Sequence, residues 1–244
     1  MAIDLALAGE AAREDALPVL RFYRWEPWAV SIGRNQDEKE FDREALRRSG
    51  IDIVRRPTGG RAILHARELT YSVVRRRSGA GPRDIYSEVN EGLLAGLKLL
   101  GIDAELSAIS DPAISLSHRR GDTLNCLPCF SSTAKSEILY RGRKLVGSAQ
   151  RRFGEVVLQH GSILLDRSHT GIVSFLAPPV AGSRSDIEDH LASHSVDAET
   201  ILGRPVTYEE VAAAIRTGCA QAWHATFDTE DYSVPISQEP ALAP

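Results

Sequence analysis

Residues 126–165, CLPCFSSTAKSEILYRGRKLVGSAQRRFGEVVLQHGSILL, decide the fold of this chain. The stretch predicts a loop and then three strands, over residues 136–140, 144–151 and 156–165, because these segments are rich in apolar and β-prone residues. Arg141 and Gly142 link the first two strands, and a two-residue link with a glycine is typical of a tight hairpin. We therefore expect a hairpin followed by a third strand.

The middle strand, residues 144–151, contains candidate catalytic residues. Successive strand side chains point to opposite faces, so one face is expected to hold Lys144, Val146, Ser148 and Gln150. The other face is expected to hold Arg143, Leu145, Gly147 and Ala149. A lysine among small residues predicts a slot lined by an amine, and Cys129 lies just upstream on a loop with Pro128. A thiol, an amine and small residues suit acyl transfer.

The composition sets the broad class. The chain has 244 residues, 43% hydrophobic and 25% charged, which is ordinary for a soluble globular enzyme with one large domain. A net charge of -4 gives no reason to expect nucleic acid binding. The chain has no apolar run of about 18 residues for a membrane span and no secretion signal. An odd number of cysteines, three, argues against a disulfide framework, so we expect a cytoplasmic protein.

Further helices and strands are expected around this stretch. The strongest helix signal is at residues 84–100, where apolar residues repeat at helical spacing. Other helices are expected at residues 1–14, 41–48, 170–176, 186–191 and 207–223, the last with Thr207 and Glu210 as a capping box. Strands are expected at residues 20–25 and 29–32, paired around Pro27, and at 51–54, 62–65, 69–74 and 103–106. Strands with flanking helices indicate an α+β fold with a mixed sheet.

Two loops attract attention. Residues 107–127 have no clear period and are expected to form a long loop, which in a compact domain is often functional. Residues 55–61, RRPTGGR, place a Gly-Gly pair between two strands and surround it with arginines. The functional interpretation is a site for an anion or an acyl-carrier arm, because glycines let backbone N–H groups approach a ligand. The alternative is a tight hairpin with solvated arginines, and the residues alone leave both open.

Several motifs together carry a resemblance to a known family. They are LRFYRWEPWAVSIG (20–33), RRPTGGRAILH (55–65), ELTYSVV (68–74), CF (129–130), SEI (136–138), GRKLVGSAQRR (142–152) and LQHGSILL (158–165). Over residues 1–227 the chain resembles the biotin/lipoate protein ligase superfamily, and within it the cysteine-dependent octanoyltransferases. The resemblance implies a mixed sheet flanked by helices, like the catalytic core of class II tRNA synthetases. Residues 228–244 are expected to be an acidic, poorly ordered tail.

The resemblance also implies an activity. An octanoyl group would pass from acyl carrier protein to a lysine of a lipoyl domain, of a 2-oxoacid dehydrogenase or a glycine-cleavage H-type protein. ATP-dependent lipoate-protein ligases are the near relatives and the first alternative. They typically carry a third glycine where this chain has Arg61, and Asn-Asp where it has Ser136-Glu137. We therefore expect no cofactor, with ATP and magnesium needed only by the ligase alternative.

Cys129 is the expected nucleophile, because Cys129-Phe130 stands where the transferases keep theirs. A lowered thiol pKa beside cations would raise the thiolate fraction. The alternative from the residues alone is a small buried apolar side chain. Cys126 makes a C-x-x-C with Cys129, but a zinc site needs two more ligands and a redox motif lacks its context, so Cys126 is expected to be structural and no metal is expected.

Lys144 is expected to contact the acyl carbonyl, where a cation stabilises the developing oxyanion; the alternative is a solvated strand lysine. The remaining expected site residues shape the acyl slot or contact substrate: Arg56, Thr58, Gly59, Gly60, Arg61, His65, Gly147, Ser148, Ala149 and His160. A histidine suits the proton acceptor for the incoming amine, although a histidine on an apolar strand is usually a hydrogen-bonded core residue.

Basic clusters at residues 75–77, 119–120 and 151–152 are candidates for steering an acidic carrier protein; the alternative is a solvated face. No interleaved aromatic residues support nucleic acid stacking. A second alternative function is a non-catalytic protein that only binds an acyl-carrier or lipoyl domain. A chain that holds both Cys129 and Lys144 argues against it.

Overall fold

The computed structural model describes residues 1–107, 137–178 and 184–229. Within these residues the larger sheet has six antiparallel strands, in spatial order β1 (Val19–Tyr23), β5 (Glu68–Arg76), β9 (Val156–Leu164), β8 (Arg143–Phe153), β7 (Ile138–Tyr140) and β6 (Glu105–Leu106). A second sheet has the order β3 (Asp52–Arg55), β2 (Ala29–Ile32), β4 (Ile63–His65), with β2 parallel to β3 and antiparallel to β4. The predicted α+β fold with a mixed sheet is confirmed, and the mixed pairing is in the smaller sheet.

The first two strands do not pair with each other. Residues 19–23 join the edge of the larger sheet beside β5, whereas residues 29–32 form the centre of the smaller sheet. The expected pairing around Pro27 is therefore wrong. Each strand instead finds a partner distant in sequence, which short-range pattern alone does not reveal.

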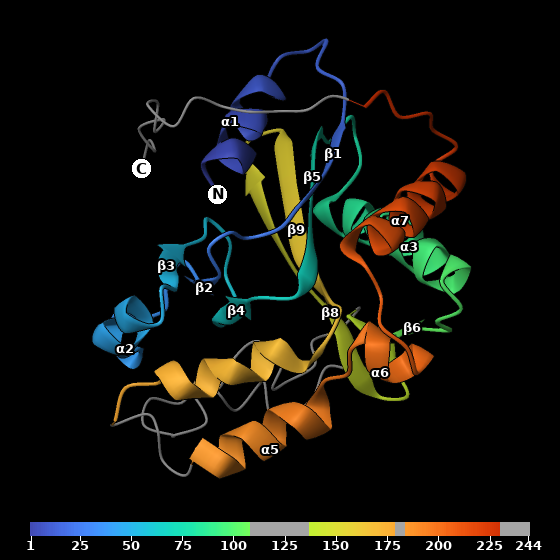
Figure 1. The fold of residues 1–244 in the computed structure, drawn as a ribbon. Coiled ribbons are helices and arrows are strands. Elements are labelled where there is room, and N and C mark those ends of the chain that lie inside the picture. The colour runs from blue at the N-terminus through green and yellow to red at the C-terminus, as the bar shows by residue number, and fades with distance from the viewer. Residues whose placement is uncertain (108–136, 179–183, 230–244) are drawn as a thin grey trace.

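Two helices cover one face of the larger sheet. α3 (Pro82–Leu99) and α7 (Tyr208–Ala222) lie against each other and pack on this face (Figure 1). Leu69, Tyr71 and Val73 of β5 point into this core. The two helices can approach closely because Gly96 and Gly218 have no side chains. A Cβ at Gly218 would lie 2.0 Å from Gly96 N. The helix at residues 84–100 is thus confirmed, with its apolar stripe buried as expected.

The opposite face of the larger sheet is partly polar. β5 places Glu68, Thr70 and Ser72 there, all buried. α1 (Ala2–Glu10) covers one part of this face through Leu7 and Ala8. The smaller sheet, with α2 (Arg43–Arg48), η4 (Arg167–Phe175) and α5 (Arg184–His194), forms a second apolar cluster that includes Leu164 of β9. Buried polar side chains between these parts form the candidate site.

Most expected helices are present. η4 is a 3₁₀ helix that covers residues 170–176 except its last residue, and α5 extends the helix expected at residues 186–191. The sequence analysis missed η1 (Glu38–Glu40) and α6 (Ala198–Leu202), although Asp197 caps α6 and Gly203 ends it with a φ of 67°. Thr207 accepts from Glu210 N–H as expected, but the Glu210 carboxylate pairs with Arg204, so the capping box is only half formed.

The central hairpin is confirmed, with an irregularity. Arg141 and Gly142 have φ values of 50° and 76°, as a two-residue type I′ turn requires. Ile138 lies opposite Val146, but Leu139 lies opposite Lys144, so Leu145 is an extra residue in β8. Two residues on one strand facing one on the other is a β-bulge, which shifts the alternation of side chains.

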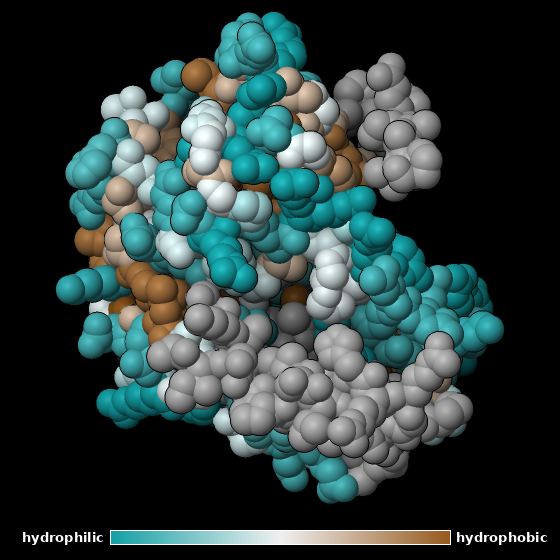
Figure 2. All heavy atoms as spheres, turned by 180° about the vertical axis from the view of Figure 1, so that it is seen from behind, coloured by the Kyte–Doolittle hydropathy of each residue, from teal (hydrophilic) through white to brown (hydrophobic). Residues whose placement is uncertain are grey.

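On the face seen from behind, the described residues are mainly hydrophilic, with separate apolar groups among them (Figure 2). Four large apolar side chains of the described chain are exposed, in different segments: Leu17, Trp28, Leu99 and Leu106. Among the described helices, none is long and apolar enough to cross a membrane.

Candidate active site

Lys144 is buried on the polar side of the larger sheet. Its side chain lies near the start of β8, is 2% exposed, and places Nζ 2.5 Å from Glu137 Oε1. A buried ammonium and carboxylate at this distance keep each other charged in an environment that disfavours an isolated charge. The solvated-strand alternative for Lys144 is therefore wrong, while carbonyl contact stays a prediction.

The bulge at Leu145 changes which residues share a face with Lys144. Leu145 and Val146 both belong to the core under α3 and α7, so Lys144 points to the opposite face. Gly147 and Ala149 lie opposite Ser162 and His160 of β9 and share the face of Lys144. The predicted grouping of Lys144 with Val146, Ser148 and Gln150 is wrong.

Ser148 faces the helix-covered core. Its Oγ lies 2.7 Å from the Tyr71 hydroxyl, and Tyr71 is fully buried. Burial raises the pKa of this tyrosine, so its hydroxyl stays protonated. The place of Ser148 in an acyl slot stays a prediction that this geometry does not favour. Gly147 and Ala149 remain on the face that the prediction requires.

Four carbonyl groups of the loop at residues 57–61 accept hydrogen bonds from the described part of the chain. Arg56, which is 5% exposed, donates to Gly59 O at 3.0 Å and also to Arg61 O. Two further carbonyl groups have fixed donors: Arg151 Nη1 reaches Pro57 O at 3.0 Å and Arg34 N–H reaches Thr58 O at 2.9 Å. The loop is also pressed against the end of β2, because a Cβ at Gly33 would lie 1.9 Å from Gly60 O.

The amide groups of this loop are left available. The N–H groups of Thr58, Gly59 and Gly60 have no hydrogen-bond partner within the described part of the chain. Gly60 has a φ of 89°, a backbone conformation that favours glycine. A Cβ at Gly59, in contrast, would meet nothing within 4 Å. Gly59 is exposed and its glycine has no steric reason within the fold. N–H groups without a protein partner beside an open glycine are suited to an anion or a carbonyl oxygen.

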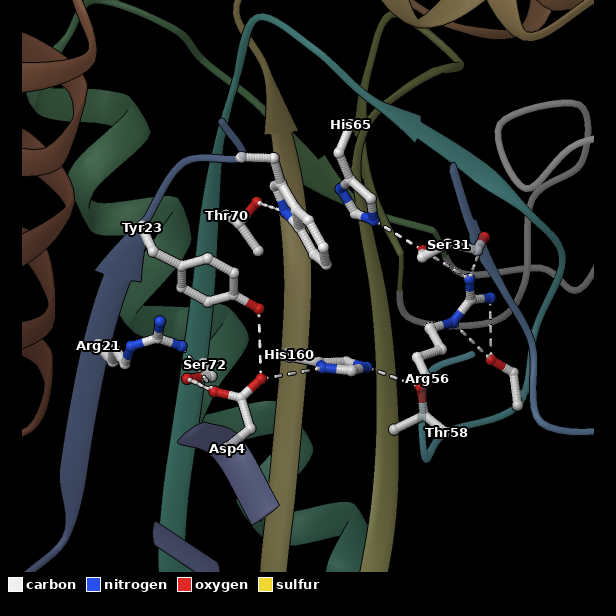
Figure 3. A network of polar contacts seen from close by, with 12 residues as sticks. Asp4, Arg21, Tyr23, Ser31, Arg56, Thr58, His65, Thr70, Ser72 and His160 are labelled. Atoms are coloured by element: carbon white, nitrogen blue, oxygen red, sulfur yellow. Dashed lines mark hydrogen bonds and ion pairs between the residues drawn. The ribbon is translucent and has the colours of Figure 1, made fainter. Parts of the chain in front are cut away.

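A buried carboxylate from α1 reaches this loop through a histidine. Asp4 Oδ2 lies 3.7 Å from His160 Nδ1, and His160 Nε2 lies 2.6 Å from Thr58 Oγ1 (Figure 3). Asp4 is fully buried and accepts three hydrogen bonds, from Arg21 (2.9 Å), Ser72 (2.9 Å) and Tyr23 (3.2 Å), whereas His160 Nδ1 is beyond hydrogen-bond distance. Thr58 is 1% exposed, so this line is closed to solvent.

The charges on this line follow from its surroundings. Burial opposes ionisation of Asp4, but His160, the N-terminal amine and Arg21 outweigh it and lower the pKa of Asp4 to about 2. Burial lowers the pKa of His160, with Asp4 opposing. Asp4 is thus a carboxylate, and His160 is held toward its neutral form.

A second buried carboxylate reaches the loop from β5. Glu68 Oε1 lies 2.5 Å from His65 Nδ1, and His65 Nε2 lies 2.7 Å from Ser31 Oγ. Ser31 Oγ in turn accepts from Arg56 Nη1 at 3.1 Å. Trp25 stacks on His65 with ring centroids 4.4 Å apart. Both nitrogens of His65 are engaged, so in this conformation it offers no free nitrogen to an incoming amine.

The thiols divide into two groups. Cys126 and Cys129 lie outside the described residues, so the nucleophile stays a prediction. Cys219 lies in α7 and is fully buried, and burial raises its pKa to about 12. A thiol that cannot ionise and has no access to substrate is not a nucleophile, which leaves the two cysteines of residues 126–129.

Three acidic residues of this region were not predicted to belong to the site: Asp4, Glu68 and Glu137. Each is at most 6% exposed, and each pairs with a predicted site residue. A single acidic residue within an apolar helical or strand pattern was the available signal. The pattern does not show which histidine or lysine it meets, because those partners come from other elements.

A hollow beside α2, lined by residues that include Asp37, Phe41 and Pro178, contains none of the predicted site residues. Among the described residues no group of three or more His, Cys, Asp or Glu side chains is placed to hold a metal ion.

Comparison with known proteins identifies the family. Residues 1–220 match the lipoyl protein ligase A/B catalytic domain. The chain belongs to this family. It is 40% identical over 227 residues to octanoyltransferase LipM of Kyrpidia tusciae, which covers 91% of this chain and 81% of the relative. The corresponding protein of Symbiobacterium thermophilum is 41% identical with the same coverage, and that of Bacillus subtilis is 34% identical over 89% of this chain and 79% of the relative.

Solved structures of the family agree on the fold. A bipartite lipoate protein ligase of Thermoplasma acidophilum has a TM-score of 0.73 at 22% identity, covering 95% of this chain and 83% of that one. A lipoate-protein ligase A with bound ATP has a TM-score of 0.71 at 23% identity, covering 95% and 85%. The resemblance inferred from the motifs is thus confirmed.

The curated relatives establish the type of activity. The chain is an acyltransferase of the lipoyl protein ligase A/B family, which contradicts the non-catalytic alternative. The relatives support octanoyl transfer in lipoate biosynthesis. The solved structures, at 22–23% identity, are evidence for the fold alone.

Proposed function

We propose that this protein transfers an octanoyl group from an acyl carrier protein to a lysine of a lipoyl domain, through a thioester on Cys129. The observation that supports this most is the similarity, at 34–41% identity over most of the chain, to proteins named octanoyltransferase. The candidate site adds a buried lysine, small residues on its face, and a loop whose amide groups have no partner in the described chain.

The first step exchanges one thioester for another. The Cys129 thiolate attacks the carbonyl carbon of the carrier thioester, and a new C–S bond forms. The tetrahedral oxyanion is stabilised by the Lys144 ammonium and by N–H groups of the 58–60 loop. The carrier C–S bond then breaks, and the carrier leaves as a thiolate that takes a proton from solvent.

The second step moves the acyl group to nitrogen. The neutral lysine amine of the acceptor attacks the Cys129 thioester, and the same groups stabilise the second oxyanion. The amine gives up one proton to solvent as the amide forms, and the C–S bond breaks so that Cys129 leaves as a thiolate that is ready for the next cycle. Because the donor is already an activated thioester, we propose that neither ATP nor magnesium is needed.

Arginines beside the loop suit an acidic carrier protein. Arg34 is exposed and Arg151 is partly exposed. The Arg34 N–H donates to Thr58 O, and Arg151 Nη1 donates to Pro57 O. The predicted cluster at residues 75–77 is less available, since Arg75 pairs with Glu88 and Arg77 lies 3.8 Å from Glu155. We propose that the carrier docks on the side of Arg34 and Arg151.

Two assays test the proposal against the ligase alternative. A lipoyl domain is incubated with the protein and octanoyl carrier protein, or with the protein, free lipoate, ATP and magnesium. We expect the lipoyl domain to gain the mass of an octanoyl group only in the first mixture. A gain in mass only in the second mixture would make the protein a ligase.

A further inference from the structure

The 57–61 loop is the part of the site whose shape depends on distant groups. Four of its carbonyl groups, those of Pro57, Thr58, Gly59 and Arg61, have donors, whereas the N–H groups of Thr58, Gly59 and Gly60 have no hydrogen-bond partner in the described chain. Two buried lines of polar contacts end at this loop, and every step in them is a hydrogen bond except that from Asp4 Oδ2 to His160 Nδ1, which spans 3.7 Å. One starts at Asp4 of α1, as Figure 3 shows, and the other starts at Glu68 of β5, which bonds His65.

We propose that Asp4 and Glu68 are positioning residues for acyl transfer. Asp4 acts through His160 on Thr58, and Glu68 acts through His65 and Ser31 on Arg56. Together the two lines fix the loop so that its amide groups face the substrate. The inference rests on the proposed function, because it assumes that the amide groups stabilise the acyl oxyanion.

The free-energy cost of burying Asp4 and Glu68 suggests that they serve more than stability. Asp4 is 0% exposed and Glu68 is 3% exposed. Apolar residues of similar size in such places are often as stabilising as a buried charged pair, or more so. Buried charged networks do, however, fix one arrangement of their members when every contact depends on the others. Here the two networks would hold the 57–61 loop in one conformation.

The geometry argues against proton transfer by either histidine. His65 has a partner at each nitrogen, and His160 is 4% exposed with Thr58 between it and the loop surface. Neither has a free nitrogen directed at solvent. Positioning of the loop is therefore the role that their contacts support.

Thr58 allows a clean test, because valine has nearly the same shape without the hydroxyl. Thr58→Val breaks the bond to His160, and Thr58→Ser restores a hydroxyl. Tyr71→Phe is the matched control: it removes a buried hydroxyl bond of 2.7 Å from the opposite face of the same sheet, with no connection to the loop. Acyl-enzyme formation with octanoyl carrier protein, alkylation of thiols by iodoacetamide and the thermal unfolding midpoint are measured for each variant.

We expect Thr58→Val to slow acyl-enzyme formation by about ten-fold or more while alkylation stays unchanged, since misplaced donors cost rate without changing the thiol. Thr58→Ser is expected to recover most of the rate. Tyr71→Phe is expected to lower the unfolding midpoint similarly and keep the rate. Equal losses of rate in Thr58→Val and Tyr71→Phe, or no loss in Thr58→Val, would overturn the proposal.

A second measurement separates this inference from the proposed function. If the wild-type protein forms no acyl-enzyme, the proposed function fails. Hydrogen exchange of the Arg34 amide then still tests whether the line from Asp4 through His160 to Thr58 positions the loop. That amide donates to Thr58 O at 2.9 Å. Faster exchange in Thr58→Val than in Tyr71→Phe supports the positioning of the loop, and equal exchange in the two variants contradicts it.

Discussion

Lys144 Nζ lies 2.5 Å from Glu137 Oε1, and both residues are buried on the sheet face that carries Gly147 and Ala149. Loss of Lys144 alone leaves a buried carboxylate without the lysine, which typically destabilises a protein by about 3–5 kcal/mol. A test of the lysine in catalysis therefore changes both partners. The double variant Glu137→Gln, Lys144→Met replaces the charged pair by neutral groups of similar size.

We expect this double variant to fold and to form its acyl-enzyme about 10²–10³ times more slowly, the usual loss for one oxyanion donor. The rate is measured by intact mass after rapid mixing with octanoyl carrier protein. Glu137→Asp alone is the control, because it keeps both a carboxylate and the ammonium. A double variant as fast as this control, with a normal circular dichroism spectrum, would show that Lys144 has no part in the chemistry.

Gly59 and Gly33 predict opposite outcomes for the same substitution. A Cβ at Gly59 would meet nothing within 4 Å, so Gly59→Ala is expected to keep the unfolding midpoint and to lose acylation rate, because the methyl group stands where substrate approaches. A Cβ at Gly33 would lie 1.9 Å from Gly60 O, so Gly33→Ala is expected to lower the midpoint. Thermal unfolding and acylation of both variants check this; an unchanged rate in Gly59→Ala contradicts a substrate beside the loop.

The bulge at Leu145 predicts different roles for two neighbouring residues. Ser148→Ala removes the bond to Tyr71 on the helix-covered face, so it is expected to cost about 1 kcal/mol of unfolding free energy and little activity. Ala149→Leu adds bulk on the face of Lys144 and is expected to lower acylation by octanoyl groups more than by acetyl groups. Denaturant unfolding and acylation with both chain lengths test the pair, and the reverse pattern would return Ser148 to the slot.

Asp4 predicts a dependence of stability on acid. Its pKa is lowered from 3.8 to about 2, so its contribution is fully present above about pH 4 and is lost as pH falls through 2. A shift of this size corresponds to about 2 kcal/mol. Asp4→Asn is expected to flatten this part of the profile in denaturant unfolding. Asp15→Asn, at an exposed aspartate, is the control, and an equal change in both variants would contradict the buried pairing.

The sequence predicted the local elements well and the long-range pairings poorly. The hairpin at Arg141 and Gly142 and the apolar stripe of α3 depend on neighbouring residues, so pattern and turn chemistry were sufficient. The separation of β1 and β2 into two sheets depends on partners far along the chain. The bulge has the same origin, because Leu145 becomes an extra residue only when β7 pairs with β8.

The candidate site shows the same division. The motifs brought together Arg56, Thr58 and His160, which the structure places at one loop. Asp4 and Glu68 were missed because burial of an acidic side chain depends on what covers it, here α1 and the smaller sheet. Ser148 was assigned to the wrong face because strict alternation fails at a bulge.

The central claim is a thioester on Cys129, and intact-mass spectrometry tests it most directly. The protein is mixed with octanoyl carrier protein, without ATP, and quenched in acid, and the labelled peptide is located by digestion. We expect one octanoyl group on Cys129, released by hydroxylamine, with no adduct in Cys129→Ser and a normal adduct in Cys126→Ser. An octanoyl group carried by Cys129→Ser, or none on the wild-type protein while the acceptor becomes octanoylated, would contradict the account.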